Sequence, residues 1–160
     1  MDYKKLSVCH LRRIHQHQVF KDTAKRGKSS VGWFYGFKLH LLINQKGEPI
    51  HFQITPANVA DNNHVTLEYM LKNVKGLCFG DKGYLSKLWN KFYNNGLKLV
   101  TKTKRNAKNI LTLLQECYLL AKRAIIESVN DILTSVFDIE HFRHRKFINA
   151  FYANCFYPNH

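Results

Sequence analysis

Short runs of apolar and β-branched residues alternate along the chain with turn-forming residues. Two of these runs, residues 35–43 and 50–55, are joined by a short segment that contains Asn, Gly and Pro. In the first run Lys38 separates Phe37 from Leu39, and this alternation is typical of a strand with one buried face. The pattern predicts two strands that pair as an antiparallel hairpin within a sheet.

The rest of the chain combines helical spacing with further short strands. Pro56 ends the second strand, Asp61 is a suitable N-cap for the next helix, and Asn95 with Gly96 ends the helix after that. No repeat or linker divides the sequence, which indicates one domain over residues 1–160. The predicted order is β-β-α-β-α-β and then a long helix. After the hairpin the elements are a helix over 61–71, a strand over 77–79, a helix over 85–94, a strand over 97–101 and a helix from about 110 to 133.

The composition adds a strong charge imbalance. The 160 residues include 25 Lys and Arg against 11 Asp and Glu, a formal net charge of +14. This imbalance favours an anionic partner, and nucleic acid bound through its phosphates is the first candidate. A cationic surface that serves only solubility is the alternative. The basic residues that recur along the chain are Lys4, Lys5, Arg12, Arg13, Lys21, Lys25, Arg26, Lys28, Lys98, Lys102, Lys104, Arg105, Lys108, Arg143, Arg145 and Lys146.

The sequence argues against a membrane protein and against disulfide stabilisation. It has no apolar stretch of about eighteen residues, and its first residues lack the apolar region of a signal peptide. Cys9, Cys78, Cys117 and Cys155 are widely spaced, without a Cys-x-x-Cys pair. We therefore expect a cytoplasmic protein with no membrane partner and with reduced, mostly buried cysteines.

One segment has the pattern of an oxygen-donating metal site. Apolar residues 76–79 lead into Asp81, which stands between Gly80 and Gly83. A buried strand that ends in this way presents a carboxylate at the edge of a sheet, and magnesium prefers such hard oxygen ligands. The histidines show no zinc spacing, and we interpret His40, in the middle of a predicted strand, as structural or groove-facing and not as a metal ligand.

Several motifs, taken together and in order, resemble a known protein family. They cover nearly the whole chain, so their combination is far more specific than any one motif. The chain resembles the catalytic domain of the DDE transposases of bacterial insertion sequences, and it is most similar to the insertion sequence 982 family. The motifs are residues 2–10, 12–14, 17–21, 26–40, 55–61, 79–84, 125–131 and 144–145.

This resemblance implies an α/β fold of the ribonuclease-H-like type, in which helices flank a mixed sheet. It also implies three carboxylates that bind two Mg²⁺ ions, for which Mn²⁺ would substitute. Asp2, Asp81 and Glu127 match these catalytic and metal-binding positions. Two metal ions can activate the attacking oxygen and stabilise the leaving oxygen at phosphorus. The implied reactions are DNA strand cleavage by water and strand transfer by a 3′-hydroxyl during transposition.

A second motif supports the assignment of Glu127. Related transposases have a Tyr-x-x-Arg-x-x-x-Glu-x-x-x-x-x-x-Lys signature, which Arg123 and Glu127 match, whereas Leu120 and Thr134 replace the Tyr and the Lys. The resemblance therefore transfers only the Arg and Glu roles. On spacing alone, Arg123, Glu127 and Asp131 would also form a solvated ladder of charges on one helix face.

The resemblance also implies DNA contacts. Trp33, at the start of a predicted strand, would stack on a base, and core packing is the alternative for this cluster of aromatic residues. We expect transposon ends and target DNA as partners in the bacterial nucleoid, and a homodimer, because transposition pairs two ends. The predicted DNA-contacting or phosphate-contacting residues are Arg123, Lys82, Lys102, Lys104, Arg105, Arg26, Lys28 and Trp33.

The start of the chain departs from the family pattern. The family places an end-recognition region before the catalytic domain, whereas only Met1 precedes Asp2 here. We therefore expect an N-terminally truncated catalytic fragment whose first strand is incomplete and frayed, which would hold Asp2 poorly and would lower or abolish activity. A ribonuclease-H-like structure-specific nuclease and a non-catalytic basic nucleic-acid-binding protein remain alternatives. A basic ribosome-associated protein would fit the composition alone.

Overall fold

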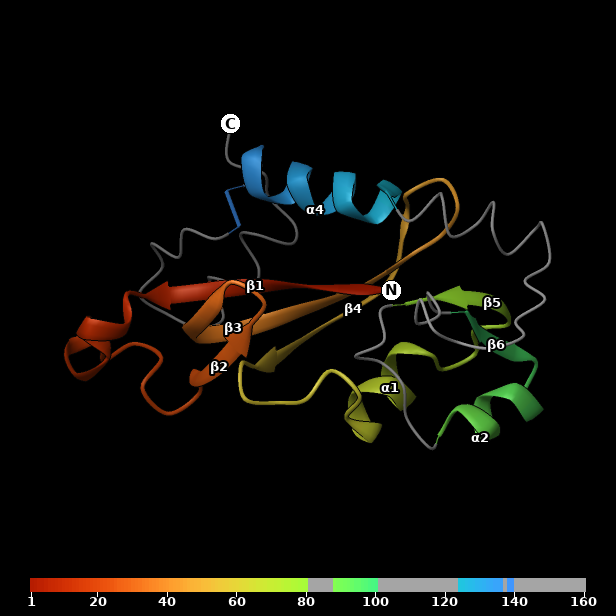
Figure 1. Ribbon diagram of the computed structural model, residues 1–160, viewed down its shortest axis with the longest axis horizontal. Helices are drawn as coiled ribbons and strands as arrows, with labels where there is room; N and C mark the ends of the chain where they lie inside the picture. Colours follow the sequence, from red (N-terminus) through yellow and green to blue (C-terminus); the bar gives the residue numbers. More distant parts are fainter. Residues whose placement is uncertain (81–87, 101–123, 137, 140–160) are drawn as a thin grey trace, which may run out of the picture. The chain divides into compact units, whose positions relative to one another are not determined.

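The computed structural model of the protein describes residues 1–80, 88–100, 124–136 and 138–139. In this part of the chain β3 pairs with β1, β2 and β4 in a four-stranded sheet, and β5 pairs with β6 in a parallel two-stranded sheet (Figure 1). Strands and helices together make a mixed α/β protein, as predicted. The elements are β1 (Asp2–Cys9), the 3-10 helix η1 (Leu11–Gln16), β2 (Lys25–Ser29), β3 (Gly32–Ile43), β4 (Pro49–Pro56), α1 (His64–Met70), β5 (Gly76–Phe79), α2 (Trp89–Asn94), β6 (Leu97–Val100) and α4 (Ala124–Ser135).

The chain forms two compact units, to both of which β1, β3, β4 and α4 contribute residues. Unit 1 consists of Met1–Asp2, Leu41–Gln53 and Ala60–Glu127, and unit 2 of Tyr3–His40, Ile54–Val59 and Ser128–His160.

The core of unit 2 is aromatic. The rings of Phe20 and Phe37 meet edge to face, with centroids 5.7 Å apart, and His17 stacks on Phe20 at 5.6 Å. Leu6 from β1 and Leu39 from β3 complete the centre of this cluster and are buried. Such ring pairs add specific geometry to the area that the side chains bury, so they hold β3 against the segment that follows η1.

The central strand β3 is buried on both faces. Phe37 and Leu39 face the aromatic core as the alternating pattern predicts, but Lys38 and His40, which alternate with them, are only 5% and 0% exposed. The prediction of a strand with one buried face is therefore wrong. Lys and His are polar residues that sequence patterning assigns to a solvent face, and only partners supplied by other segments allow them to be buried here.

Those partners form a polar cluster on the second face of β3. The Nζ of Lys38 donates a hydrogen bond to the carbonyl oxygen of Val59 at 2.9 Å and lies 4.9 Å from the ring centroid of Tyr3. Nε2 of His40 lies 2.9 Å from the Thr55 hydroxyl oxygen. A buried charge or imidazole is tolerated when it is paired in this way, so the interpretation of His40 as structural fits its surroundings.

A tight hairpin joins β2 to β3, which pair antiparallel from Lys25 opposite Gly36 to Ser29 opposite Gly32. Gly27 lies where a Cβ would be 2.2 Å from the carbonyl oxygen of Ala57. The sequence pattern does not predict β2, because its residues are basic and small and show no apolar alternation. Tertiary contact at Gly27 and pairing with β3 form this strand.

Most predicted elements of unit 1 are confirmed within a few residues. The side chain of Asn63 caps α1 by accepting hydrogen bonds from the backbone of Val65 and Thr66 at 3.0 and 3.3 Å, so the prediction of Asp61 as the N-cap is wrong. Both β5 and β6 are present, and α2 ends before Gly96, which has a φ of +83°. The predicted starts of the second helix at 85 and of the long helix at 110 lie outside the described residues.

The turn between β3 and β4 forms as predicted. The backbone NH of Asn44 donates to the carbonyl oxygen of Glu48 at 2.9 Å, and Oδ1 of Asn44 accepts from the backbone of Lys46 and Glu48. A loop this short can join only antiparallel strands, so β3 and β4 form the expected hairpin.

Replacement of Gly27 by Ala tests the close contact beneath β2. The new methyl group would overlap the backbone of Ala57, so we expect the free energy of unfolding in urea to fall by about 1–3 kcal/mol. The control is Lys25→Ala in the same strand, where the side chain is exposed and the expected change is within about 0.5 kcal/mol. Equal stabilities of the two variants would contradict the packing described for Gly27.

Thr55→Val tests the buried hydrogen bond of His40. The change leaves Nε2 of His40 without the hydroxyl at 2.9 Å, so the free energy of unfolding should fall by about 1–3 kcal/mol. Thr55→Ser keeps the hydroxyl and should retain most of the stability lost in the Val variant. The two variants are compared by urea denaturation at neutral pH, and a Val variant as stable as the Ser variant would exclude this role of Thr55.

Candidate functional site

Unit 1 contains a cavity of about 200 Å³. Segments far apart in the sequence line it: Met1, the end of β3 with the start of β4, the strand β5, and the start of α4. Its lining includes Leu42, Ile43 and Ile50 from the hairpin and Phe79 from β5. The cavity wall is therefore mainly apolar.

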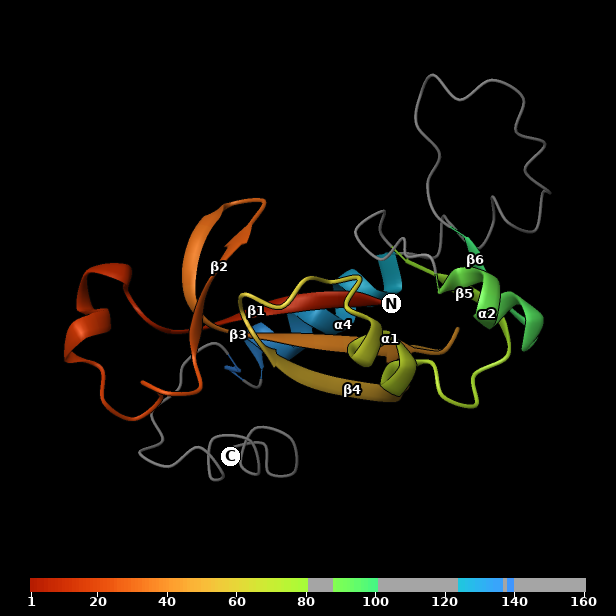
Figure 2. The same cartoon turned by 90° about the horizontal axis from the view of Figure 1, so that it is seen from below.

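The beginning of β1 and the end of β5 meet at this cavity. The amino group of Met1 donates a hydrogen bond to the carbonyl oxygen of Phe79 at 2.5 Å, and Met1 is only 8% exposed. Figures 1 and 2 both show the marked N-terminus beside β5, whose arrow points toward it. The strand β1 starts at Asp2 itself, so its first residues lie in the sheet.

The third segment at the cavity is the first turn of α4. Ile125 and Ile126 line the cavity, and Ile126 is 4% exposed. Glu127 follows directly in the same turn and has an exposed side chain. Ile125 and Ile126 therefore pack the start of α4 against the cavity, and the carboxylate of Glu127 lies outside this apolar contact.

Each of these three segments has a cavity-lining residue close in sequence to one of the predicted catalytic positions. Met1 directly precedes Asp2, Phe79 lies two residues before position 81, and Ile126 directly precedes Glu127. The structure thus brings the segments that lead to all three carboxylate positions to one cavity. Asp81 itself lies outside the described residues, as do Arg123 and the predicted contact residues Lys82, Lys102, Lys104 and Arg105.

The donors at the described triad positions suit a hard divalent cation. Asp2 and Glu127 offer carboxylate oxygens, the ligands that Mg²⁺ and Mn²⁺ accept, and neither position offers sulfur or imidazole. Among the residues that the structure describes, no three His, Cys, Asp or Glu side chains gather as a complete metal site. Asp2 and Glu127 each directly follow a residue that lines the cavity, so their donor type and their place in the sequence are compatible with the predicted metal site.

Of the two described cysteines, Cys78 is buried, as predicted, and Cys9 is half-buried. Cys9 and Cys78 are free thiols, and Cys78 is buried beside the cavity. Burial raises the pKa of the Cys78 thiol, which keeps it protonated and unreactive at neutral pH. Cys117 and Cys155 lie outside the described residues.

Three predicted DNA-contacting residues are described, and they lie together on the β2–β3 hairpin. Arg26 and Lys28 are exposed on β2, and Trp33 on β3 is 62% exposed. The neighbouring aromatic residues Phe34 and Tyr35 are buried at 5% and 6%. Core packing thus accounts for the neighbours but not for Trp33.

The cavity itself was not predicted, although the sequence contained a signal for it. Alternation in β3 breaks down after Leu41, because the apolar residues Leu42 and Ile43 follow it directly. Both line the cavity, together with Ile50 from the next strand. A loss of alternation at a strand end is therefore the sequence signature of this second apolar surface.

Comparison with known proteins identifies the family of this chain. A family model described as "Transposase DDE domain" matches residues 1–147 of the 160. Neither the curated proteins nor the solved structures give a significant match. Of the helices that the structure describes, none is long and apolar enough to span a membrane. Because the match covers most of the chain, the chain belongs to the family of DNA transposases with a DDE domain.

Proposed function

We propose that this chain is the catalytic domain of an insertion-sequence transposase, similar to the insertion sequence 982 family, that cleaves DNA strands and joins them by strand transfer. The observation that supports it best is the cavity at which the segments leading to Asp2, Asp81 and Glu127 meet. A single ribonuclease-H-like domain is the arrangement we infer for the complete chain.

The three carboxylates would hold two Mg²⁺ ions or two Mn²⁺ ions. Bound there, the ions would supply Lewis-acid activation of the attacking oxygen and neutralise charge on the leaving oxygen. The protein would contribute rigid placement of the carboxylates. Asp2 is the first residue of β1 and follows Met1, which is hydrogen-bonded to Phe79, and Glu127 follows the buried Ile126. Such support matters because displacement of a catalytic group by about 1 Å can lower a rate a hundredfold.

The DNA substrate would be held by charge. A net charge of +14 on 160 residues provides many phosphate contacts, and Arg26 and Lys28 are exposed on β2. Binding by released counterions is independent of sequence, so recognition of transposon ends would need further contacts. We infer a homodimer for the paired ends, because each end needs a catalytic centre.

Loss of one carboxylate should abolish nicking of supercoiled plasmid. We expect Asp81→Asn and Glu127→Gln each to lower the Mg²⁺-dependent or Mn²⁺-dependent nicking rate by about a hundredfold or more, because each removes a charged ligand from the metal site. The matched control is Asp131→Asn, one turn further along α4, which removes an exposed carboxylate and should retain activity.

The outcomes separate three classes of protein. Nicking that depends on both carboxylates and favours transposon ends supports the transposase, and nicking without any end preference indicates a structure-specific nuclease. If salt-sensitive DNA binding remains but purified protein shows no nicking with either metal, the chain is a non-catalytic binder and the proposed function is wrong.

Phosphate binding by β2 predicts a specific salt dependence. Arg26→Gln should reduce the slope of log K for duplex DNA against log salt concentration by about one, because one phosphate contact is lost. Lys91→Gln is the matched control: Lys91 already forms an ion pair with Glu68 at 2.8 Å, and its hydrogen bond is the main reason that the pKa of Glu68 is lowered. An unchanged slope for Arg26→Gln, measured by fluorescence anisotropy, would exclude Arg26 as a contact.

A further inference from the structure

The cavity of unit 1 reaches the surface between the β3–β4 hairpin and the start of β5. We propose that it binds a small aromatic carboxylate, with the single ring in the apolar cavity and the carboxylate beside the ammonium group of Lys75. This ligand site goes beyond the proposed function, and binding to it does not depend on that function. The lining residues that are exposed, and so mark the mouth of the cavity, are Gln45, Ile50, Lys75 and Leu77.

The inner wall of the cavity is buried and apolar. Leu42, Cys78 and Ile126 line it, and all three are almost inaccessible to solvent. A water molecule inside a protein needs about two to four polar partners, and these side chains supply at most a weak thiol donor. An apolar group is therefore the better occupant of the inner part of the cavity.

The size of the cavity limits the ligand to one ring. An apolar cavity of about 150 Å³ is large enough for benzene, and the cavity here has a volume of about 200 Å³. Sites for drug-sized molecules begin at about 300 Å³. A benzene ring with one short substituent therefore fits, whereas a ligand of two or three rings does not.

The mouth of the cavity exposes large apolar side chains. Ile50 on β4 is 47% exposed and Leu77 on β5 is 43% exposed, and both line the cavity. A ligand that covers them removes further apolar surface from water, which contributes to affinity in proportion to the area. The outer part of the site thus favours a ligand whose apolar body extends to the mouth.

The polar side chains at the mouth favour an anion. Asn44 is already used by the turn, because its Oδ1 accepts from the backbone of Lys46 and Glu48 and its Nδ2 donates to the Glu48 carboxylate. Lys75 is the single charged side chain among the described residues that line the cavity. It is exposed, and no described carboxylate forms an ion pair with it. Its ammonium group is therefore available to a ligand carboxylate.

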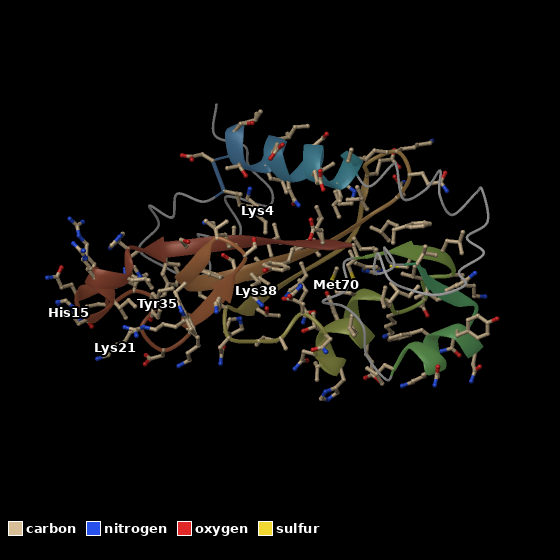
Figure 3. All side chains as sticks on the ribbon, viewed as in Figure 1. Lys4, His15, Lys21, Tyr35, Lys38 and Met70 are labelled. Carbon is tan, nitrogen blue, oxygen red and sulfur yellow. The ribbon has the colours of Figure 1, made fainter. Side chains whose placement is uncertain are left out.

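The segment that carries Lys75 is fixed at both ends before a ligand binds. Met70, the last residue of α1 (labelled in Figure 3), is fully buried. At the start of β5 the backbone NH of Gly76 donates to the carbonyl oxygen of Gly96 at 2.9 Å. A mouth held in this way loses little conformational freedom on binding, which favours affinity.

Calorimetric titration of the full chain with para-ethylbenzoate tests the site. At neutral pH and without metal we expect a dissociation constant of about 0.1–1 mM, because the ligand has few atoms. The amide para-ethylbenzamide has the same shape without the charge and should bind about two- to fivefold more weakly. Acetate has the charge without the ring and should give no saturable binding. An affinity for the amide or for acetate equal to that for para-ethylbenzoate would overturn the proposal.

Substitution of Lys75 tests the contact with the carboxylate. Lys75→Gln should weaken para-ethylbenzoate by about two- to fivefold and leave the affinity for the amide unchanged. Lys72→Gln is the matched control, since it removes the same charge from an exposed residue that does not line the cavity. An equal loss of affinity in the two variants would show that the net charge of the chain, and not Lys75, attracts the ligand, and would overturn the proposal.

A larger side chain inside the cavity should exclude the ring. Val74 lines the cavity from the segment between α1 and β5, so Val74→Phe should weaken para-ethylbenzoate by about tenfold or more. The control is Val65→Phe, at an exposed position of α1 outside the cavity, which should retain binding. Circular dichroism melting verifies that each variant folds, and unchanged affinity in a folded Val74→Phe chain would overturn the proposal.

Protection of Cys78 locates the ligand without any substitution. The thiol lies at the cavity, and alkylation by iodoacetamide is followed by mass spectrometry at about pH 9, because the raised pKa of this thiol makes it unreactive at neutral pH. Saturating para-ethylbenzoate should slow alkylation of Cys78 and leave Cys9, in unit 2, unchanged. Alkylation of Cys78 at the same rate with and without the ligand would overturn the proposal.

The position of the site links it to the proposed function. Phe79 and Ile126 line the cavity and precede positions 81 and 127, so a ligand that displaces these walls should slow the predicted nicking. A nicking rate unchanged at saturation would exclude this effect and leave the proposed function intact. A chain that binds para-ethylbenzoate, protects Cys78 and nicks DNA with neither metal retains the ligand site and contradicts the proposed function instead.

Discussion

The four-stranded sheet depends on close backbone contact at one position of its central strand. A Cβ on Gly36 would lie 1.9 Å from the carbonyl oxygen of Leu6, and Gly36 has a φ of +157°. The carbonyl oxygen of Gly36 also accepts a hydrogen bond from the backbone of Ala57 at 3.1 Å. Since β3 pairs with β1, β2 and β4, the missing side chain at 36 lets neighbouring segments approach the one strand that holds the sheet together.

Burial of polar groups on β3 specifies the register of this strand in the sheet. A slip of one residue in the register of β3 would exchange Lys38 and His40 with Phe37 and Leu39. The slipped arrangement would place the charge of Lys38 in the aromatic core and remove it from the carbonyl of Val59 and the ring of Tyr3. Because an unpaired buried charge is far more costly than a paired one, the polar cluster favours a single register.

The proposed functions involve two different surfaces. At the cavity of unit 1, apolar packing of Met1, Phe79 and Ile126 sets the positions from which carboxylates would extend. At the β2–β3 hairpin the side chains are exposed instead of packed. A turn stabilised by the Ser29 hydroxyl leaves Trp33 and Lys28 open to solvent. The first surface suits chemistry that requires exact placement, and the second suits a long polyanion that many cations can hold.

Local pattern determined much of this protein. Apolar runs of the right length located β3, β4, β5 and β6, turn residues located the ends of the β3–β4 hairpin, and the order of the motifs along the chain indicated the transposase family. Tertiary structure alone decided the strand β2, the burial of Lys38 and His40, and the exposure of Trp33 beside the buried Phe34. The physical reason is the same in each case: sequence spacing states which residues can share a face, but partners distant in the sequence determine whether that face meets water, a carbonyl or another ring.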